Sequence, residues 1–270
     1  MPLKIILLIV SLWGAGFSIA GYLLYQLFRS GHFLRYGVAL LSLAALAFGL
    51  SYIYLPCFPY QTSTVMCHIP KNQKSHQIAL TFDDGPQSPY TEEILDILKK
   101  ENIPATFFIL GKYAEKNPNL VKRIVTEGHA IGNHGWSHIP LAFKNREFIQ
   151  TEIESWEKVM SPWGEQPYKI FRASHGWKNP WLVSILHQKG YQLIGWNVGV
   201  WDSDKPGKDV LLERLNANLD EGSIILLHDG DGDHEGADRS QTVAILPELI
   251  RECRSRGYTF VTIPEMMNKP

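Results

Sequence analysis

The 270-residue chain has little cysteine and almost no net charge. Its three cysteines are too few for a domain built on a disulfide scaffold. A formal net charge of −1 removes the electrostatic case for a nucleic-acid partner. Cys253 falls in a helical pattern and is expected in the core. Cys57 and Cys67 lie ten positions apart and either form a disulfide or stay free thiols.

Charged side chains are missing from two long stretches near the N-terminus. Residues 5–28 and 36–57 contain no Asp, Glu, Lys or Arg. At a rise of about 1.5 Å per residue, each stretch is long enough to cross about 30 Å of hydrocarbon. A cleaved secretory signal and a buried helical hairpin are the alternatives, but no small-x-small cleavage site ends the first stretch. We favour a two-helix transmembrane hairpin over residues 1–58, anchored in the lipid bilayer.

The turn between these two stretches contains Arg29 and Arg35. Because cytoplasmic loops are enriched in Lys and Arg, this turn is expected in the cytoplasm. Both ends of the hairpin then face outward, so the rest of the chain is expected at the outer side of the cell membrane. Residues 59–74 are polar and unpatterned, which predicts a linker to a domain over residues 75–270.

Residues 75–270 repeat one order of elements: a helical run that ends at glycine, a short apolar strand and a polar turn. Glycine accepts the left-handed backbone past a helix end at little cost, and an Asn-Pro pair suits a helix start. These signals occur at Gly128, Gly190, Gly222, Gly257, Asn117-Pro118 and Asn179-Pro180. Strands alternating with helices predict an α/β fold with a parallel sheet, open or closed into a barrel.

Side chains capable of chemistry follow the predicted strands at their C-terminal ends. That edge carries the functional sites of α/β barrels and open sheets. The set is Asp83 and Asp84 after residues 78–82, His134 and His138 after 130–131, Arg172 after 168–171, Trp201 and Asp202 after 193–196, and His228 after 224–227.

Four of these residues predict a metal centre. Adjacent carboxylates such as Asp83 and Asp84 repel each other unless one holds a proton or a cation neutralises the pair. His134 and His138 are four positions apart, so on a helical turn their rings would share a face. With Asp84 as a third ligand, such a site suits zinc first, or cobalt, nickel or iron, and leaves one position open for water. Asp83 is then free to act as a base.

Thr81-Phe82-Asp83-Asp84-Gly85, His134-Gly135-Trp136-Ser137-His138, Arg172 and Leu226-Leu227-His228 occur in this order. Over residues 77–263 they resemble the motifs of the polysaccharide deacetylases that share the NodB homology domain, carbohydrate esterase family 4. The resemblance implies a distorted (β/α) barrel with Asp83 as catalytic base and Asp84, His134 and His138 as metal ligands. It also implies that Arg172 orients the base, that His228 is the general acid, and that Leu226 lines the acetyl pocket.

Two motifs depart from the family pattern. The third, usually Arg-x-Pro-Tyr, reads Arg172-Ala-Ser-His175 here, and this changes the expected shape of the substrate site. In the fourth, Gly199 and Ser203 stand where the family has an aspartate and a tryptophan, while Asp202 keeps the second aspartate. Asp202 either orients a partner such as His228 or is an ordinary turn residue. Trp201 either stacks on a sugar or packs in the core.

An acidic segment, residues 229–235, follows His228. It lacks the glycine and the glutamate that an EF-hand calcium loop needs at its sixth and twelfth positions. We expect it to form an acidic rim beside His228.

Together these features predict a membrane-anchored, metal-dependent hydrolase that removes N-acetyl groups from amino sugars of a cell-envelope or chitin-like glycan. Such a reaction needs a base for the attacking water and an acid for the departing amine. The alternatives are a deacylase of another amide or an ester, and a pseudoenzyme that binds glycan without hydrolysing it.

Overall fold

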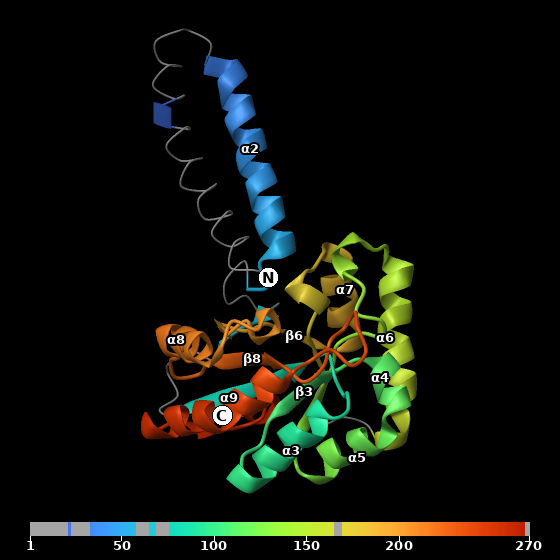
Figure 1. Cartoon of the computed structure of the whole chain (residues 1–270). Coiled ribbons are helices and arrows are strands. Elements are labelled where there is room, and N and C mark those ends of the chain that lie inside the picture. The colour runs from blue at the N-terminus through green and yellow to red at the C-terminus, as the bar shows by residue number, and fades with distance from the viewer. Residues whose placement is uncertain (1–20, 23–32, 58–64, 69–75, 165–168, 268–270) are drawn as a thin grey trace.

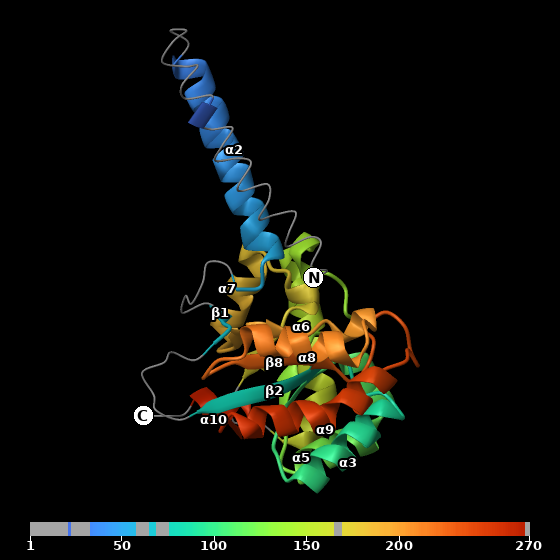
Figure 2. The same cartoon turned by 60° about the vertical axis from the view of Figure 1, so that its left-hand side comes forward.

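A computed structural model describes residues 21–22, 33–57, 65–68, 76–164 and 169–267 of the chain (Figures 1 and 2). A curled sheet lies at the centre of the main body, and helices surround it. A long helix, α2 (Phe33–Tyr54), projects away from that body.

The strands form one sheet whose order is β1-β6-β5-β4-β3-β2-β8-β7, with β9 paired to the first residues of β2. All of these pairs are parallel, as the sequence predicted. Within the described part of the chain, an isolated antiparallel bridge between His68 and Ser223 joins the segment after β1 to the residue before β8, so the sheet curls back toward its first strand. The result is an incomplete barrel. The strands are β1 (Val65–Met66), β2 (Gln77–Asp83), β3 (Thr106–Ile109), β4 (Ala130–Asn133), β5 (Ile170–Phe171), β6 (Gln192–Ile194), β7 (Val198–Gly199), β8 (Ile224–His228) and β9 (Thr259–Phe260).

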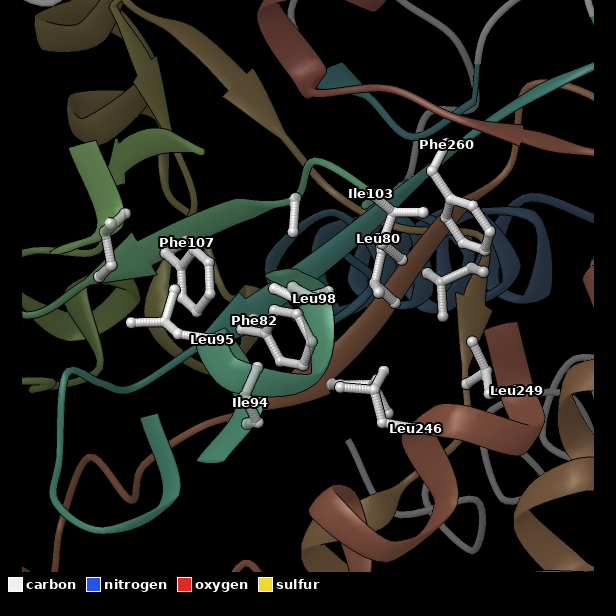
Figure 3. Packing of buried hydrophobic residues seen from close by; sticks show 14 of the residues in the cluster. Leu80, Phe82, Ile94, Leu95, Leu98, Ile103, Phe107, Leu246, Leu249 and Phe260 are labelled. Atoms are coloured by element: carbon white, nitrogen blue, oxygen red, sulfur yellow. The ribbon is translucent and has the colours of Figure 1, made fainter. Parts of the chain in front are cut away.

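The side chains of β2 point alternately to the inside of the barrel and to the helices that surround it. Successive side chains of a strand point to opposite faces. Leu80 and Phe82 belong to the large apolar cluster under the outer helices, where Phe82 stacks on Phe107 at 5.1 Å between ring centroids (Figure 3). Ala79 belongs instead to a separate cluster with residues of α10. Asp83 has the same parity as Ala79 and therefore faces the interior of the barrel.

Eight further α-helices are described besides α2. They are α3 (Tyr90–Glu101), α4 (Gly111–Lys116), α5 (Pro118–Thr126), α6 (Arg146–Met160), α7 (Pro180–Lys189), α8 (Lys208–Asn218), α9 (Ser240–Ser255) and α10 (Ile263–Met267). Short 3₁₀ turns occupy Leu141–Phe143, Ser161–Trp163, Ser174–Gly176 and Asp202–Asp204.

The predicted helix ends are mostly confirmed. Asn179 caps α7 by accepting from the Leu182 backbone N–H at 2.9 Å. The predicted glycines all have positive φ, as in Gly190 at 75° after α7. Asn117 is the exception, because its side chain donates to the carbonyls of Pro86 and Tyr113 instead of capping α5.

Among the described residues, one helix is long and apolar enough to cross a membrane, by its length and composition alone. This is the Gly37–Tyr54 part of α2, and its large side chains are open to the surroundings, with Leu41 73% and Leu46 59% exposed. Of the first of the two predicted spans only residues 21–22 are described, so the two-helix hairpin stays a prediction.

Part of the predicted linker belongs to the sheet. Val65 and Met66 form β1 and pair with β6, and a disulfide joins Cys57 to Cys67. The segment 59–74 was predicted as a linker because most of its residues are polar. A buried strand of only two residues barely changes the average composition of such a segment. Cys253 is a free, buried thiol, as expected.

Candidate active site

Sheet register brings two candidate catalytic residues side by side. β2 and β8 pair so that Asp83 lies opposite His228. Leu226 precedes His228 by two positions and therefore has the same inward parity. Arg172 follows β5 directly and is fully buried. The carboxyl ends of these strands form one edge, which is where the sequence placed the chemistry.

Asp84, His134 and His138 converge on one point. Asp84 Oδ1 lies 3.2 Å from Nε2 of each histidine, and one ligand atom from each of the three residues lies within 4.8 Å of the others. All three side chains are buried. The arrangement therefore presents one carboxylate and two imidazole nitrogens to a common centre, a donor set that suits a divalent transition metal.

The two histidine rings are held through their Nδ1 atoms, which leaves the Nε2 atoms facing Asp84. His134 Nδ1 donates to the Arg172 carbonyl at 2.8 Å, and His138 Nδ1 donates to Asp233 Oδ1 at 3.2 Å. Such hydrogen bonds fix the tautomer and orientation of metal-binding histidines. Asp84 Oδ1 is buried and accepts no hydrogen bond. A buried acceptor without a donor is costly, so the residues fit a cation at this centre.

The electrostatics of the site also favour a cation. Burial opposes ionisation of Asp84, but His138 and His134 outweigh it and leave the pKa of Asp84 well below its usual value. Burial likewise opposes protonation of His138, but Asp84 and Asp233 raise the pKa of His138 to about 9. The Asp84 carboxylate is therefore ionised and is balanced by a positive charge beside it, which protonated His138 supplies and which a metal ion would supply equally.

The loop that carries the two histidines differs from the prediction. Residues 134–140 form no helical turn; Gly135 and His138 have left-handed backbones with φ of 84° and 72°. Glu152 on α6 holds this loop, accepting from the backbone N–H of Trp136 and of Ser137 at 2.9 Å each. Nothing in the sequence marks Glu152 among the other charged residues of its helix, so this contact could not be predicted.

Arg172 binds Asp83 inside the barrel. Its Nη1 donates to Asp83 Oδ1 at 2.7 Å and to the Thr81 hydroxyl at 2.8 Å, and its Nη2 donates to the Gly195 carbonyl at 3.1 Å. The guanidinium lies 4.0 Å from the centre of the Phe108 ring. Asp83 Oδ2 takes part in none of these bonds and lies 3.9 Å from His134 Nε2, beside the Asp84-His134-His138 cluster. One oxygen is thus held while the other is available.

His228 is paired with Asp202. His228 Nδ1 donates to Asp202 Oδ1 at 2.8 Å, and the other oxygen accepts from the His228 backbone N–H and the Thr242 hydroxyl at 2.8 and 2.6 Å. Burial opposes charge on both partners, but their attraction raises the pKa of His228 and lowers that of Asp202. Nε2 of His228 remains the free ring nitrogen. Asp202 is 1% exposed, so it is not the solvated turn residue of the alternative interpretation.

The acidic segment after His228 is only partly a rim. Asp229 is fully buried and accepts from the Gly85 backbone N–H and the Thr91 hydroxyl, at 3.1 and 2.6 Å. A Cβ on Gly85 would lie 2.0 Å from the Asp229 carboxylate. Burial, with repulsion from Asp84 and Asp83, raises the pKa of Asp229 to about 7. Asp233 does lie at the surface, but it binds His138, so this segment supports the site directly.

The structure shows what surrounds the residues that depart from the third and fourth family motifs. At Gly199, an added Cβ would meet Trp196 at 3.0 Å and Trp201 at 3.6 Å, so two indoles occupy the space of the family's aspartate side chain. Trp201 is half-buried with a φ of 57°. His175, with a φ of 58°, places its ring 4.6 Å from the His138 ring. Backbone strain therefore accompanies the substitution nearest to the metal centre.

Comparison with known proteins agrees with this geometry. The polysaccharide deacetylase family model matches residues 70–194. A peptidoglycan-N-acetylglucosamine deacetylase of Bacillus cereus is 36% identical over 211 residues, which covers 76% of this chain and 94% of the relative. A chitooligosaccharide deacetylase of Sinorhizobium fredii is 34% identical over 194 residues, 70% of this chain and 90% of the relative.

A solved structure of a peptidoglycan N-acetylglucosamine deacetylase, in complex with an N-hydroxybenzamide compound, superposes with a TM-score of 0.70 at 35% identity, covering 76% of this chain and 92% of that one. A pseudoenzyme of carbohydrate esterase family 4 from Bacillus anthracis shares the fold, with a TM-score of 0.68 at 24% identity over 77% of this chain and 70% of that one. Fold, site and sequence thus agree, and the chain belongs to the polysaccharide deacetylase family, carbohydrate esterase family 4.

Proposed function

We propose that this protein is a metal-dependent deacetylase that removes N-acetyl groups from amino sugars of an extracytoplasmic glycan. One observation carries the proposal. A free carboxylate oxygen of Asp83 and the ring of His228 lie on adjacent strands, in register, beside a buried Asp84-His134-His138 centre. Base, acid and metal ligands therefore surround one space at the edge of the barrel.

Each of these residues has a role in amide hydrolysis. A divalent metal ion, zinc in the first instance, held by Asp84, His134 and His138 would polarise the acetyl carbonyl and make the attacking water more acidic. Asp83 accepts the proton of that water through Oδ2, while Arg172 holds its other oxygen. The oxygen of that water bonds to the acetyl carbonyl carbon, and the C–N bond then breaks. The imidazolium of His228 donates its Nε2 proton to the departing amine.

The products are acetate and a free amino sugar. Asp202 keeps the His228 imidazolium populated through the Nδ1 hydrogen bond, and it is a positioning residue because it meets no reacting atom. We assign Leu226, His175 and Trp201 to substrate binding, from their places on the inward face of β8, beside His138 and beside the 3₁₀ turn of Asp202.

Two features support a location outside the cytoplasm. The exposed, apolar helix α2 suits a bilayer, and the Cys57–Cys67 disulfide suits an oxidising compartment. We therefore propose that the catalytic domain is membrane-anchored and faces an envelope glycan such as peptidoglycan. A different amide or an ester on the same centre is the second candidate, because His175 and Ser203 change the surroundings of the site.

The test uses the full chain in detergent or nanodiscs, stripped with chelator and assayed for acetate release from N-acetylglucosamine oligomers and peptidoglycan. Adding zinc or cobalt restores activity if the proposal is correct. Asp83→Asn abolishes turnover but still binds zinc, whereas the surface substitution Asp96→Asn changes neither. Full zinc occupancy with no acetate from any glycan refutes the deacetylase and favours another acyl substrate or a binding role.

A further inference from the structure

The end of helix α2 is built into the rim of the catalytic site. Its last residue, Tyr54, packs its ring edge-on against Trp177 at 5.1 Å. Trp177 lies 5.1 Å from His175, and His175 lies 4.6 Å from the metal-site residue His138, all between ring centroids. Three ring contacts thus connect the membrane helix with a proposed metal ligand.

Lys178 joins the two segments with buried hydrogen bonds. The last carbonyls of a helix have no partner within the helix, and Lys178 supplies one by donating its backbone N–H to the Ile53 carbonyl at 3.1 Å. Its ammonium donates to the carbonyls of Leu55 at 2.7 Å and Pro56 at 3.3 Å. The side chain is 1% exposed, and burial lowers the pKa of Lys178 to about 8. A buried cation is kept only where its donors are used.

Gly176 allows this close approach. It has a φ of 72°, and a Cβ at this position would lie 2.6 Å from Pro56 and 2.7 Å from Trp196. No side chain fits there without displacing the segment that follows α2. The backbone of Gly176, in the third-motif loop of residues 172–178, therefore packs directly against the Pro56 ring.

A second route runs through the disulfide. A Cβ on Gly195 would lie 2.3 Å from Cys67 Sγ and 3.1 Å from Cys57 Sγ, so the disulfide rests on the Gly195 backbone. The Gly195 carbonyl accepts from Arg172 at 3.1 Å, and Arg172 in turn holds Asp83 at 2.7 Å. The end of α2 thus reaches both the metal ligands and the proposed base.

From these contacts we infer that residues 53–57, the end of the membrane helix with its disulfide, are a positioning element of the catalytic site. This inference rests on the proposed deacetylase activity. Lys178 and Gly176 are positioning residues, because they act through His175 and touch no reacting atom. The site is complete only while the membrane helix is docked, and its mouth is held beside the point where the chain leaves the proposed bilayer.

Matched glycine variants of the full chain in nanodiscs test this inference. Gly176→Ala and Gly190→Ala both place alanine at a left-handed backbone, with φ of 72° and 75°, but a Cβ on Gly190 meets nothing within 4 Å. Both variants therefore share the conformational cost, and only Gly176→Ala displaces Pro56. A small misplacement of catalytic groups lowers rates by up to about a hundredfold, so we expect kcat of Gly176→Ala to fall by roughly tenfold to a hundredfold. Gly190→Ala should keep the wild-type kcat.

Lys178→Met provides a second arm, with substitution of the exposed Lys122, Lys122→Met, as its control. We expect hydrogen exchange of residues 172–178 to become faster in Lys178→Met and in Gly176→Ala, while exchange of β2 and β8 stays unchanged. This readout needs no substrate. A wild-type chain that hydrolyses no glycan therefore refutes the proposed function, and the exchange data still decide whether α2 orders the loop.

Replacing Cys57 and Cys67 together by serine should also lower kcat, whereas Cys253→Ala should not. The inference is overturned if Gly176→Ala and Lys178→Met keep wild-type kcat and wild-type exchange in residues 172–178. It is equally overturned if both glycine variants lose the same activity, because the loss then comes from backbone strain alone.

Discussion

Replacing Asp202 by asparagine tests the His228 pair with almost no change of shape. Both carboxylate oxygens accept in the structure: Oδ1 from His228 Nδ1, and Oδ2 from the His228 backbone N–H and the Thr242 hydroxyl. An amide accepts only through its oxygen. If that oxygen faces the backbone N–H, the NH2 group donates to Nδ1 and the proton of the neutral ring moves to Nε2. In the other orientation the buried backbone N–H loses its acceptor.

The magnitude follows from these contacts. An unsatisfied buried donor costs about 1–3 kcal/mol of stability. For the reaction, general acid catalysis contributes about 10²–10⁴-fold, and Asp202→Asn weakens the acid without removing it. We therefore expect kcat/KM at pH 8 to fall by roughly a hundredfold, with the larger part of the loss in kcat.

The sign of the pH effect is fixed by the raised pKa of His228. Burial opposes the charged ring, but Asp202 outweighs burial, so the imidazolium persists to a higher pH than in an ordinary histidine. Activity that needs the imidazolium falls as the pH rises through this pKa. Asp202→Asn removes the negative charge and should move the alkaline limb of the kcat/KM profile to lower pH, so that the two enzymes approach each other in acid.

The assay is acetate release from pH 5 to 9 by the zinc-loaded full chain, together with thermal unfolding. Asp204→Asn is the control, since Asp204 lies two positions away and is exposed. An unchanged alkaline limb in Asp202→Asn refutes the pairing as a functional device. The same shift in Asp204→Asn refutes it too, because the effect is then one of general electrostatics.

Three further predictions concern the metal, the Asp84 turn and a distant histidine. Zinc should raise the melting temperature of chelator-treated protein in a concentration-dependent way, and Asp84→Asn should abolish this shift, as calorimetry can check. Gly85→Ala should lower the free energy of unfolding by roughly 1–3 kcal/mol and weaken zinc binding, because its Cβ meets the Asp229 carboxylate. The control Gly128→Ala has open space around it. It should lower the free energy of unfolding by about 1 kcal/mol and leave zinc affinity unchanged. Burial lowers the pKa of His129 to about 4 in the folded protein, whereas in the unfolded chain this histidine binds a proton near pH 6.5. Stability should therefore be lost as the pH falls from about 6.5 toward 4. In His129→Gln, the free energy of unfolding measured with urea should change less with pH across that window.

Much of the fold and site was predictable because it depends on local patterns. Apolar strands that end in polar residues, with helices between them, predicted a parallel sheet and one functional edge, and the structure confirms both. Asp83 and His228 lie at the ends of strands that pair in register, so their positions at strand ends were enough to predict that they lie close together. Asn179-Pro180 and Gly190 marked the two ends of α7 because capping is decided within a few residues.

What the sequence did not reveal depends on partners that other elements of the fold supply. Glu152 lies on α6, which begins after the histidine loop, and accepts hydrogen bonds from that loop. Asp229 accepts from the Gly85 backbone N–H, next to Asp84, across a separation of 144 residues. Both are buried carboxylates in segments whose composition is that of a solvated surface. The sequence around a carboxylate does not show whether it is buried or which groups it binds, because the hydrogen-bond donors that offset the cost of its burial come from the tertiary fold.

The end of α2 follows the same logic. Residues after an apolar span are expected to separate an anchor from its domain, and polarity over residues 59–74 supported that prediction. Pro56, which the sequence placed in the predicted membrane hairpin, packs on Gly176, and the backbone N–H of Lys178 caps α2 at the Ile53 carbonyl. Gly176 is the residue that makes this contact possible, and its φ of 72° follows from the fold, not from its neighbours in sequence. An anchor joined to its domain in this way transmits its position to the loop it touches, whereas a tether would only limit how far the domain travels.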